Sequence, residues 1–216
     1  MAKRIAFYGG TFDPVHRGHM DVAAGVTRLF GLDEFVFVPA FHAPHKKRIK
    51  PTSAFHRFAM LCEASDAIQG TSVSTVELEL PDRPYTIETI GRVRNEYPDH
   101  RIFFVIGADS WQEITTWRNW ETVLTEVDII VVTRPGHAIS FDHVTDRIRD
   151  RIVDLREEND DQGSAEKARS IFITDTVFTD ISATRIRKMI REKNKGWRAL
   201  VDKNIAEHID KYNLYS

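Results

Sequence analysis

The segment Gly9-Gly10-Thr11-Phe12-Asp13-Pro14-Val15-His16-Arg17-Gly18-His19 follows the short apolar run Arg4–Tyr8 and leads into an amphipathic stretch that ends at Phe30. This order predicts a buried strand, a glycine-rich turn and a helix. Glycines let the backbone approach a ligand closely, and the free N–H groups at a helix start favour an anion. The segment therefore predicts a phosphate-binding turn in an α/β fold.

Two histidines distinguish this turn from other phosphate loops. Its spacing matches neither GxGxxG nor GxxxxGK[ST]. His16 and His19 are three residues apart, so in a first helical turn they lie on one face. Their ring N–H groups could stabilise charge on a phosphoryl group during transfer. Two alternatives stay open: ordinary surface histidines, or a zinc site, although no third ligand follows at a suitable spacing.

The rest of the chain alternates strand and helix patterns. Strands are expected at Arg4–Tyr8, Glu34–Pro39, Arg101–Ile106, Asp128–Thr133 and Ser170–Thr174, with a half-exposed strand at Thr75–Leu80. Helices are expected at Gly18–Phe30, with Gly31 as C-cap, and at Ala54–Glu63, Thr86–Tyr97, Asn119–Glu126, Phe141–Leu155, Ala183–Lys193 and Val201–Tyr212. The alternation predicts a Rossmann-like, doubly wound, mostly parallel sheet with helices on both faces and a C-terminal helical portion. We expect one domain over residues 1–216, with residues 156–167 as a mobile surface excursion.

Composition excludes several classes of protein. With 216 residues, 42% of them hydrophobic and 29% charged, the chain has the composition of a globular domain. A net charge of −2 gives no overall basic field, so no nucleic-acid partner is expected. No apolar stretch approaches the ~18 residues of a membrane span, so no membrane partner is expected. The single cysteine, Cys62, suits a reducing compartment, and we expect the cytoplasm.

A second phosphate element stands near the C-terminus, at Ile181-Ser182-Ala183-Thr184-Arg185-Ile186-Arg187. Ser182 or Thr184 would serve as a helix N-cap, and the free N–H groups behind it would favour an anion. Arg187 could add a bidentate grip on phosphate. The alternative is a routine capped helix with a solvated basic face.

Together these two segments resemble the signatures GxFDPxHxGH and ISSTxIR of the nucleotidyltransferase superfamily, with Ala183 in place of a serine. The resemblance implies that His16 and His19 contact the ATP α- and β-phosphates and Arg187 the β- and γ-phosphates. The implied ATP-binding set is Gly9, Gly10, Thr11, Phe12, His16, His19, Ile181, Ser182, Thr184 and Arg187.

Three further segments could hold an acceptor. The loop after Pro39 carries His45 and Lys46, the Pro84-Tyr85-Thr86 segment precedes a helix, and Gly107 and Asp109 end a strand upstream of three tryptophans. A cation run such as Lys46–Lys50 is more often a solvated loop. Trp117 could stack on a flat ring, whereas for Trp111 and Trp120 we prefer packing against the sheet.

These segments resemble the PHK, PYTxxT and GxD…W elements of bacterial nicotinate mononucleotide adenylyltransferases, with Ala43 in place of a usual proline. The implied mononucleotide-binding set is Thr11, His45, Lys46, Tyr85, Thr86, Gly107, Asp109 and Trp117. In this reading Thr11 lies near the attacking phosphate, Thr86 near the nicotinate and Asp109 near a ribose, with Trp117 on the pyridine ring.

The resemblance implies attack of a mononucleotide phosphate on the ATP α-phosphorus, aided by His16, His19, Lys46 and Arg187. Mg²⁺ would be held by ATP phosphates and water rather than by a carboxylate cage. Three alternatives stay open: a nicotinamide mononucleotide or phosphopantetheine acceptor, a non-catalytic nucleotide-binding regulator, and an RNA-binding module built on Lys46–Lys50. The sequence also leaves open a homo-oligomer and the role of Phe141–Lys167.

Overall fold

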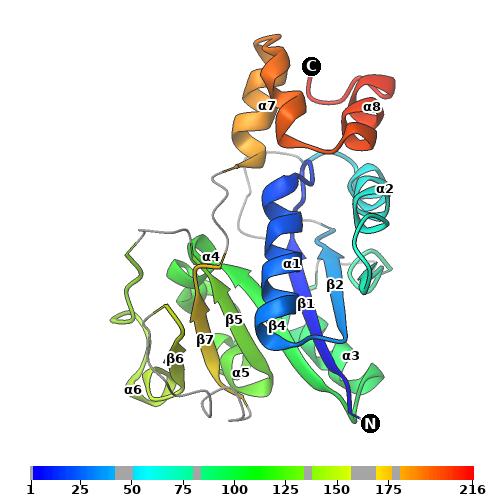
Figure 1. Ribbon diagram of the computed structural model, residues 1–216. Coiled ribbons are helices and arrows are strands. Elements are labelled where there is room, and N and C mark those ends of the chain that lie inside the picture. The colour runs from blue at the N-terminus through cyan, green and yellow to red at the C-terminus, as the bar shows by residue number, and fades with distance from the viewer. Residues whose placement is uncertain (1, 42–50, 80–83, 134–137, 157–168, 177–180) are drawn as a thin grey trace.

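The computed structural model describes residues 2–41, 51–79, 84–133, 138–156, 169–176 and 181–216. Within these ranges the chain forms one sheet of seven parallel strands in the order β3-β2-β1-β4-β5-β7-β6, with helices on both faces (Figure 1). This is the expected Rossmann-like, doubly wound architecture. None of the helices in these ranges is both long and apolar enough to cross a bilayer.

The strands are β1 (Arg4–Gly10), β2 (Glu34–Pro39), β3 (Thr71–Val73), β4 (Arg101–Gly107), β5 (Asp128–Val132), β6 (Ile152–Asp154) and β7 (Ile171–Thr174). The α-helices are α1 (Arg17–Phe30), α2 (Ala54–Ser65), α3 (Thr86–Glu96), α4 (Ala108–Gln112), α5 (Trp120–Glu126), α6 (Asp146–Arg149), α7 (Ala183–Arg191) and α8 (Lys203–Lys211). Short 3-10 helices cover Ile114–Thr116 and Lys195–Leu200.

The central strand β1 lies at the point where the strand order reverses. It pairs with β2 on one side and with β4 on the other, and its carboxyl end runs straight into the glycine-rich turn. Ligands of open α/β sheets bind beyond the carboxyl ends of the strands at such a switch point. In Figure 1, α7 and α8 lie at this end of the molecule, above β1 and β2. The topology therefore brings both predicted signatures to the same edge of the sheet.

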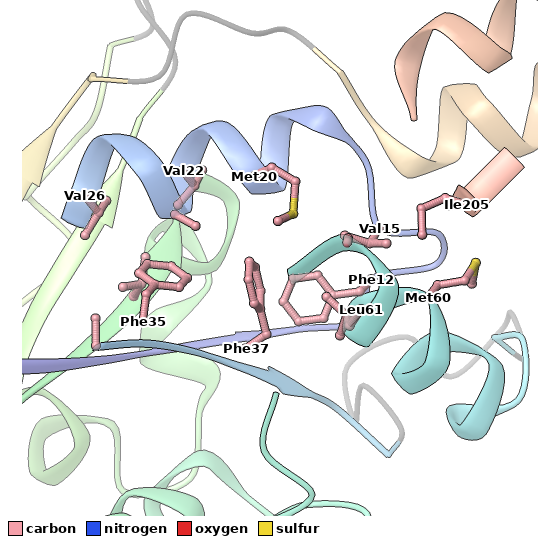
Figure 2. Packing of buried hydrophobic residues seen from close by; sticks show 14 of the residues in the cluster. Phe12, Val15, Met20, Val22, Val26, Phe35, Phe37, Met60, Leu61 and Ile205 are labelled. Atoms are coloured by element: carbon pink, nitrogen blue, oxygen red, sulfur yellow. The ribbon is translucent and has the colours of Figure 1, made fainter. Parts of the chain in front are cut away.

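Each sheet face carries its own apolar layer because side chains alternate along a strand. Phe35, Phe37 and Phe103 pack with α1, α2 and the C-terminal helices on one face. Figure 2 shows Phe12 and Val15, from the turn itself, inside this layer beside Leu61 and Ile205. The opposite face packs Phe7, Val36 and Phe104 against α3, α4 and α5. The turn is thus fastened to the core by two of its own side chains.

Most expected elements are confirmed, several within one or two residues of their predicted ends. Gly31 is the C-cap of α1, in the left-handed conformation at φ 55°. Two predictions are wrong. Val76–Glu79 forms a turn and a bend rather than the strand predicted at Thr75–Leu80, and the strand lies earlier, at Thr71–Val73. The helix predicted at Phe141–Leu155 is reduced to α6, followed by β6.

Both errors have physical reasons. Glu77 alternates with leucines and valine as in a half-exposed strand, yet its carboxylate folds back to accept a hydrogen bond from Thr89 Oγ1 at 2.8 Å. In the second segment, Ile152–Asp154 pairs with β7 at the sheet edge, and this pairing outweighs the helical spacing of the preceding apolar residues.

Candidate active site

The glycine-rich turn is shaped by the ring of Phe12. Phe12 adopts φ 50° and is only 2% exposed, so its ring folds back over the preceding backbone. A Cβ at Gly10 would lie 2.8 Å from Phe12 Cζ, closer than real Cβ contacts occur. Gly10 is therefore required by the chain's own packing.

His16 and His19 lie face to face at the start of α1. Their rings stack with centroids 3.7 Å apart and an interplanar angle of 21°. The His16 main-chain N–H donates to His19 Nδ1 at 3.2 Å, which leaves the proton of a neutral His19 ring on Nε2. Burial and the adjacent His16 hold the pKa of His19 well below 6.5. His19 is thus a neutral imidazole whose remaining donor is fixed in direction.

The first residue of the second signature, Ile181, lies close to Gly18 in the first signature. A Cβ at Gly18 would lie 3.2 Å from His16 Nδ1 and 3.7 Å from the Cβ of Ile181, so the backbones of the two segments approach closely here. Ser182, rather than Thr184, is the N-cap of α7 and accepts from the Arg185 N–H at 3.2 Å. The loss of a hydroxyl at Ala183 therefore leaves the cap intact.

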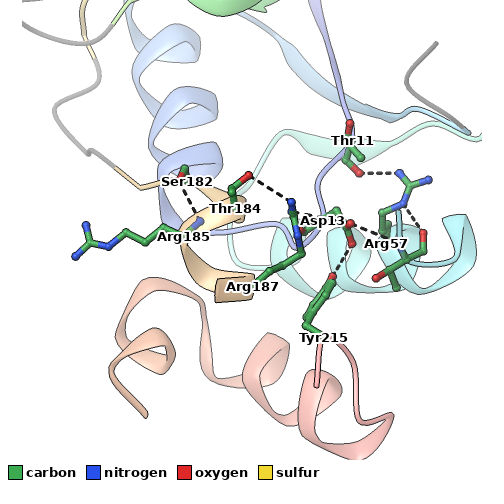
Figure 3. Close-up of polar contacts among 9 residues, drawn as sticks. Thr11, Asp13, Arg57, Ser182, Thr184, Arg185, Arg187 and Tyr215 are labelled. Atoms are coloured by element: carbon green, nitrogen blue, oxygen red, sulfur yellow. Dashed lines mark hydrogen bonds and ion pairs between the residues drawn. The ribbon is translucent and has the colours of Figure 1, made fainter. Parts of the chain in front are cut away.

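Arg187 reaches from α7 to the turn, as Figure 3 shows. Its Nη1 donates to the main-chain oxygen of Asp13 at 2.6 Å, and its Nη2 to Thr184 Oγ1 at 3.3 Å. The Asp13 carboxylate forms only a long ion pair with Arg187 Nη1, at 4.0 Å from Oδ2, and is hydrogen-bonded by other groups. Its Oδ1 accepts from the Tyr215 hydroxyl at 2.8 Å, and its Oδ2 from the Thr52 N–H at 3.3 Å. The guanidinium is held by one N–H of Nη1 and one of Nη2, out of the five N–H groups that an arginine carries.

Arg57 braces the same turn from inside, and sequence reasoning missed it. It is fully buried and donates to four main-chain oxygens: Thr11 at 2.6 Å, Ala40 at 2.7 Å, Phe41 at 3.1 Å and Thr52 at 3.0 Å. Burial lowers the pKa of its guanidinium, while Asp13, Tyr215 and Glu77 raise it. Figure 3 shows Arg57 pointing to Thr11 from the side opposite Arg187. A single side chain thus joins the turn to the segment after β2.

Five of the predicted acceptor residues lie at the carboxyl ends of β1 and β4 or at the start of α3: Thr11, Tyr85, Thr86, Gly107 and Asp109. Tyr85 is the N-cap residue of α3 and Thr86 its first residue, while the Arg118 guanidinium lies 4.9 Å from the centre of the Tyr85 ring. Gly107 ends β4, and Asp109 is exposed in the first turn of α4. Trp117 is half-buried after the 3-10 helix.

The other predicted residues fall into two groups. Trp111 is fully buried and donates from Nε1 to the Ser140 oxygen at 2.9 Å, and Trp120 packs partly buried beside the same core, as predicted. His45, Lys46 and the rest of the Lys46–Lys50 cluster lie outside the described residues, as do Ala43 and most of residues 156–167. Their predicted roles stay predictions.

A cavity of about 500 Å³ lies at the opposite edge of the sheet, at the amino ends of β4 and β5. Its arginines Arg94 and Arg101 form ion pairs with Glu126 and Asp128. It shares no residue with either signature, and we do not assign it to the site. Across the described ranges, no group of three or more His, Cys, Asp and Glu side chains could hold a metal ion.

Comparisons with known proteins agree with this geometry. The cytidylyltransferase-like family model matches residues 7–189. A protein of Desulfatibacillum aliphaticivorans named "probable nicotinate-nucleotide adenylyltransferase" is 33% identical over 98% of this chain and 99% of its own length. One of the same name from Corynebacterium jeikeium is 32% identical over 96% of this chain and 98% of its own. The chain belongs to the nicotinate-nucleotide adenylyltransferase family.

Membership of the nicotinate-nucleotide adenylyltransferases makes the chain a nucleotidyltransferase enzyme, as the two signatures predicted. The fold agrees as well. Plasmodium falciparum nicotinic acid mononucleotide adenylyltransferase, solved in complex with NaAD, superposes with a TM-score of 0.73 over 99% of this chain and 97% of its own, at 19% identity. At that identity the likeness concerns the fold alone.

Proposed function

We propose that the chain joins nicotinate mononucleotide to ATP, forming nicotinate adenine dinucleotide and pyrophosphate in a step of NAD biosynthesis. In this reaction an oxygen of the mononucleotide phosphate attacks the ATP α-phosphorus, and the bond from that phosphorus to the oxygen of the β-phosphate breaks. Such chemistry needs positioning and charge neutralisation rather than a covalent nucleophile. The single observation that carries the proposal is the stacked His16–His19 pair beside the anchored Arg187.

His19 supports the proposal by its fixed tautomer. The His16 N–H occupies Nδ1, so Nε2–H is the group that would face the triphosphate. A neutral donor held by the backbone needs no reorganisation as charge builds up on the phosphoryl oxygens. The first helical turn of α1 adds its N–H groups to the same anion. We assign His16 and His19 to the α- and β-phosphates.

Arg187 would bind the β- and γ-phosphates with the donors that Asp13 and Thr184 leave unused. Lys46 would add a second cation. Gly9, Gly10, Thr11 and Phe12 would lie along the triphosphate, with Ile181, Ser182 and Thr184 closing its other side. The approach of Ile181 to the start of α1 supports a single binding site for both signatures.

The acceptor would lie toward α3 and α4. The N–H groups after Thr86 begin a helix, and they would bind a carboxylate better than an amide because a carboxamide brings its own donors. Trp117 would stack on the pyridine ring. Tyr85, Gly107 and Asp109 would contact the rest of the mononucleotide, with His45, Lys46 and Thr11 at its phosphate.

Mg²⁺ would enter with the ATP phosphates and supply positive charge to the leaving pyrophosphate. The carboxylate of the turn, Asp13, is consistent with a metal held by phosphates and water. Asp13 is 6% exposed and both its oxygens accept hydrogen bonds, so it is committed to holding the turn rather than to a metal.

The deciding experiment is pyrophosphate release from ATP with a panel of acceptors: nicotinate mononucleotide, nicotinamide mononucleotide and phosphopantetheine. We expect nicotinate mononucleotide to give the highest kcat/KM. A higher value for another acceptor would replace the assigned substrate, and ATP binding without release by any of them would identify a regulator.

Two broader proposals accompany this function. We propose that residues 1–216 fold as one domain, which a single calorimetric transition would support and two separate ones would contradict. The lone Cys62 fits a reducing compartment, and we propose the cytoplasm. Cell fractionation tests that location.

A further inference from the structure

We propose that Tyr215 is a positioning residue for ATP, whose hydroxyl keeps the Asp13 carboxylate from capturing Arg187. The inference rests on the proposed role of Arg187 as a phosphate ligand. It adds to the site a residue that lies outside both signatures.

The C-terminal segment is folded back onto the turn by its own contacts. After α8, Asn213 and Tyr215 adopt positive φ angles of 50° and 69°, and Leu214 N–H donates to the Ile209 oxygen at 3.0 Å. Leu214 and Tyr215 pack against the same apolar layer as Phe12 and Val15. This geometry delivers the Tyr215 hydroxyl to Asp13 Oδ1 at 2.8 Å (Figure 3). Positive φ values are uncommon outside glycine, so the conformation depends on these contacts.

The Tyr215 hydroxyl and the Arg187 guanidinium are both close enough to Asp13 to compete for its carboxylate. Its carboxylate is buried and receives the Tyr215 hydroxyl and the Thr52 N–H, while Arg187 Nη1 lies 4.0 Å from Oδ2 and bonds the main-chain oxygen instead. A buried carboxylate that loses a donor carries an unmet demand for a hydrogen bond. Arg187 Nη1 is already 4.0 Å from Oδ2, and a small shift would let it meet this demand in a closer ion pair with Asp13. The other charged neighbour, Arg57, is held by four main-chain oxygens.

Such an ion pair would weaken the grip on phosphate. Arg187 can present its donors to a ligand only while Asp13 is satisfied elsewhere. Loss of the Tyr215 hydroxyl should therefore weaken ATP binding about 10-fold, the scale of one hydrogen bond to a charged group. Binding of the mononucleotide should change much less, because its ring and ribose are assigned to α3, α4 and Trp117, and no contact of Tyr215 reaches α3 or α4 in the described part of the chain.

The test compares Tyr215→Phe with wild type by calorimetric titration of Mg–ATP without acceptor, followed by KM values for ATP and the mononucleotide. Tyr212→Phe is the matched control. Tyr212 is the C-cap residue of α8, is 48% exposed and contacts His56 and His208 through its ring. We expect weaker ATP binding only in Tyr215→Phe. Equal ATP affinities in the two variants would overturn the proposal.

A double-mutant comparison isolates the route through Arg187. In an Arg187→Lys background the phosphate grip is already lost, so Tyr215→Phe should add little further weakening. Additive effects would show that Tyr215 does not act through Arg187. The titration separates the two proposals, since ATP affinity is measurable even if no acceptor is adenylylated.

Discussion

Arg187 Nη1 lies 2.6 Å from the main-chain oxygen of Asp13, so the second signature is hydrogen-bonded to the middle of the first. The contact fixes where the guanidinium stands relative to His16 and His19. It also makes the proposed anion site a product of tertiary structure, because neither segment alone has the complete set of donors. We therefore expect a mutation of His19 to lower turnover and a mutation of Arg187 to raise KM for ATP.

His19→Ala should lower turnover at least ~100-fold while leaving the fold intact, the scale of losing a preorganised donor to the transition state. Steady-state pyrophosphate release measures the effect. His100→Ala, at the opposite edge of the sheet, is the control and should retain wild-type turnover. More than a tenth of wild-type turnover in His19→Ala would contradict the assignment.

Arg187→Lys should raise KM for ATP more than KM for the mononucleotide. An ammonium cannot hold Asp13, Thr184 and phosphate at once as a planar guanidinium can. Arg185→Lys is the control, since that exposed side chain points away from the turn in Figure 3 and should leave both constants unchanged. An effect confined to the mononucleotide would place Arg187 on the wrong substrate.

Trp117→Ala should lower mononucleotide affinity roughly 5- to 150-fold, because stacking on a flat ring contributes about 1–3 kcal/mol. ATP affinity should not change. The preference for nicotinate over nicotinamide should persist, because we assign it to the helix start at Thr86. Acceptor titrations with Trp117→Ala and the control Trp120→Phe check both points. Unchanged acceptor affinity in Trp117→Ala would assign Trp117 to packing alone.

Glu77 should make stability depend on pH. Burial raises the pKa of Glu77 to about 7 against 4.5, opposed by the Thr89 hydrogen bond and the Arg57 charge. Between these values the folded state binds more protons than the unfolded state, so stability falls as pH rises from about 4.5 to about 7. Glu77→Gln removes this loss.

The measurement is chemical denaturation of wild type and Glu77→Gln at pH 5 and pH 8. From pH 5 to pH 8, the free energy of unfolding of Glu77→Gln should rise relative to that of wild type by up to about 3 kcal/mol, on the scale of 1.36 kcal/mol for each pKa unit. If the free energies of unfolding of the variant and wild type differ by the same amount at both pH values, the pKa of Glu77 is not raised. Glu79→Gln, on the exposed side of the same turn, serves as control.

Local patterns predicted the parts of the site that depend on a short stretch of chain. The turn, the helix starts and the mostly parallel, doubly wound sheet follow from glycine placement and apolar periodicity, and the structure agrees. Arg57 escaped prediction because an arginine within an amphipathic helix looks solvated, and only the fold shows that the carbonyls of Thr11 and Ala40 surround it. The contact of Tyr215 with Asp13 escaped prediction because of its range. Tyr215 and Asp13 are 202 positions apart, a separation that no local pattern encodes.

The contact between Asp13 and Arg187 can form only late in protein synthesis. The two residues are 174 positions apart. At the usual 5–20 residues per second, a ribosome that has just made the turn needs about 10 to 35 s more to reach Arg187. Throughout that interval the nascent chain carries histidines without their arginine. The proposed nucleotide site is therefore complete only late in translation, after β1 to β7 have all been made.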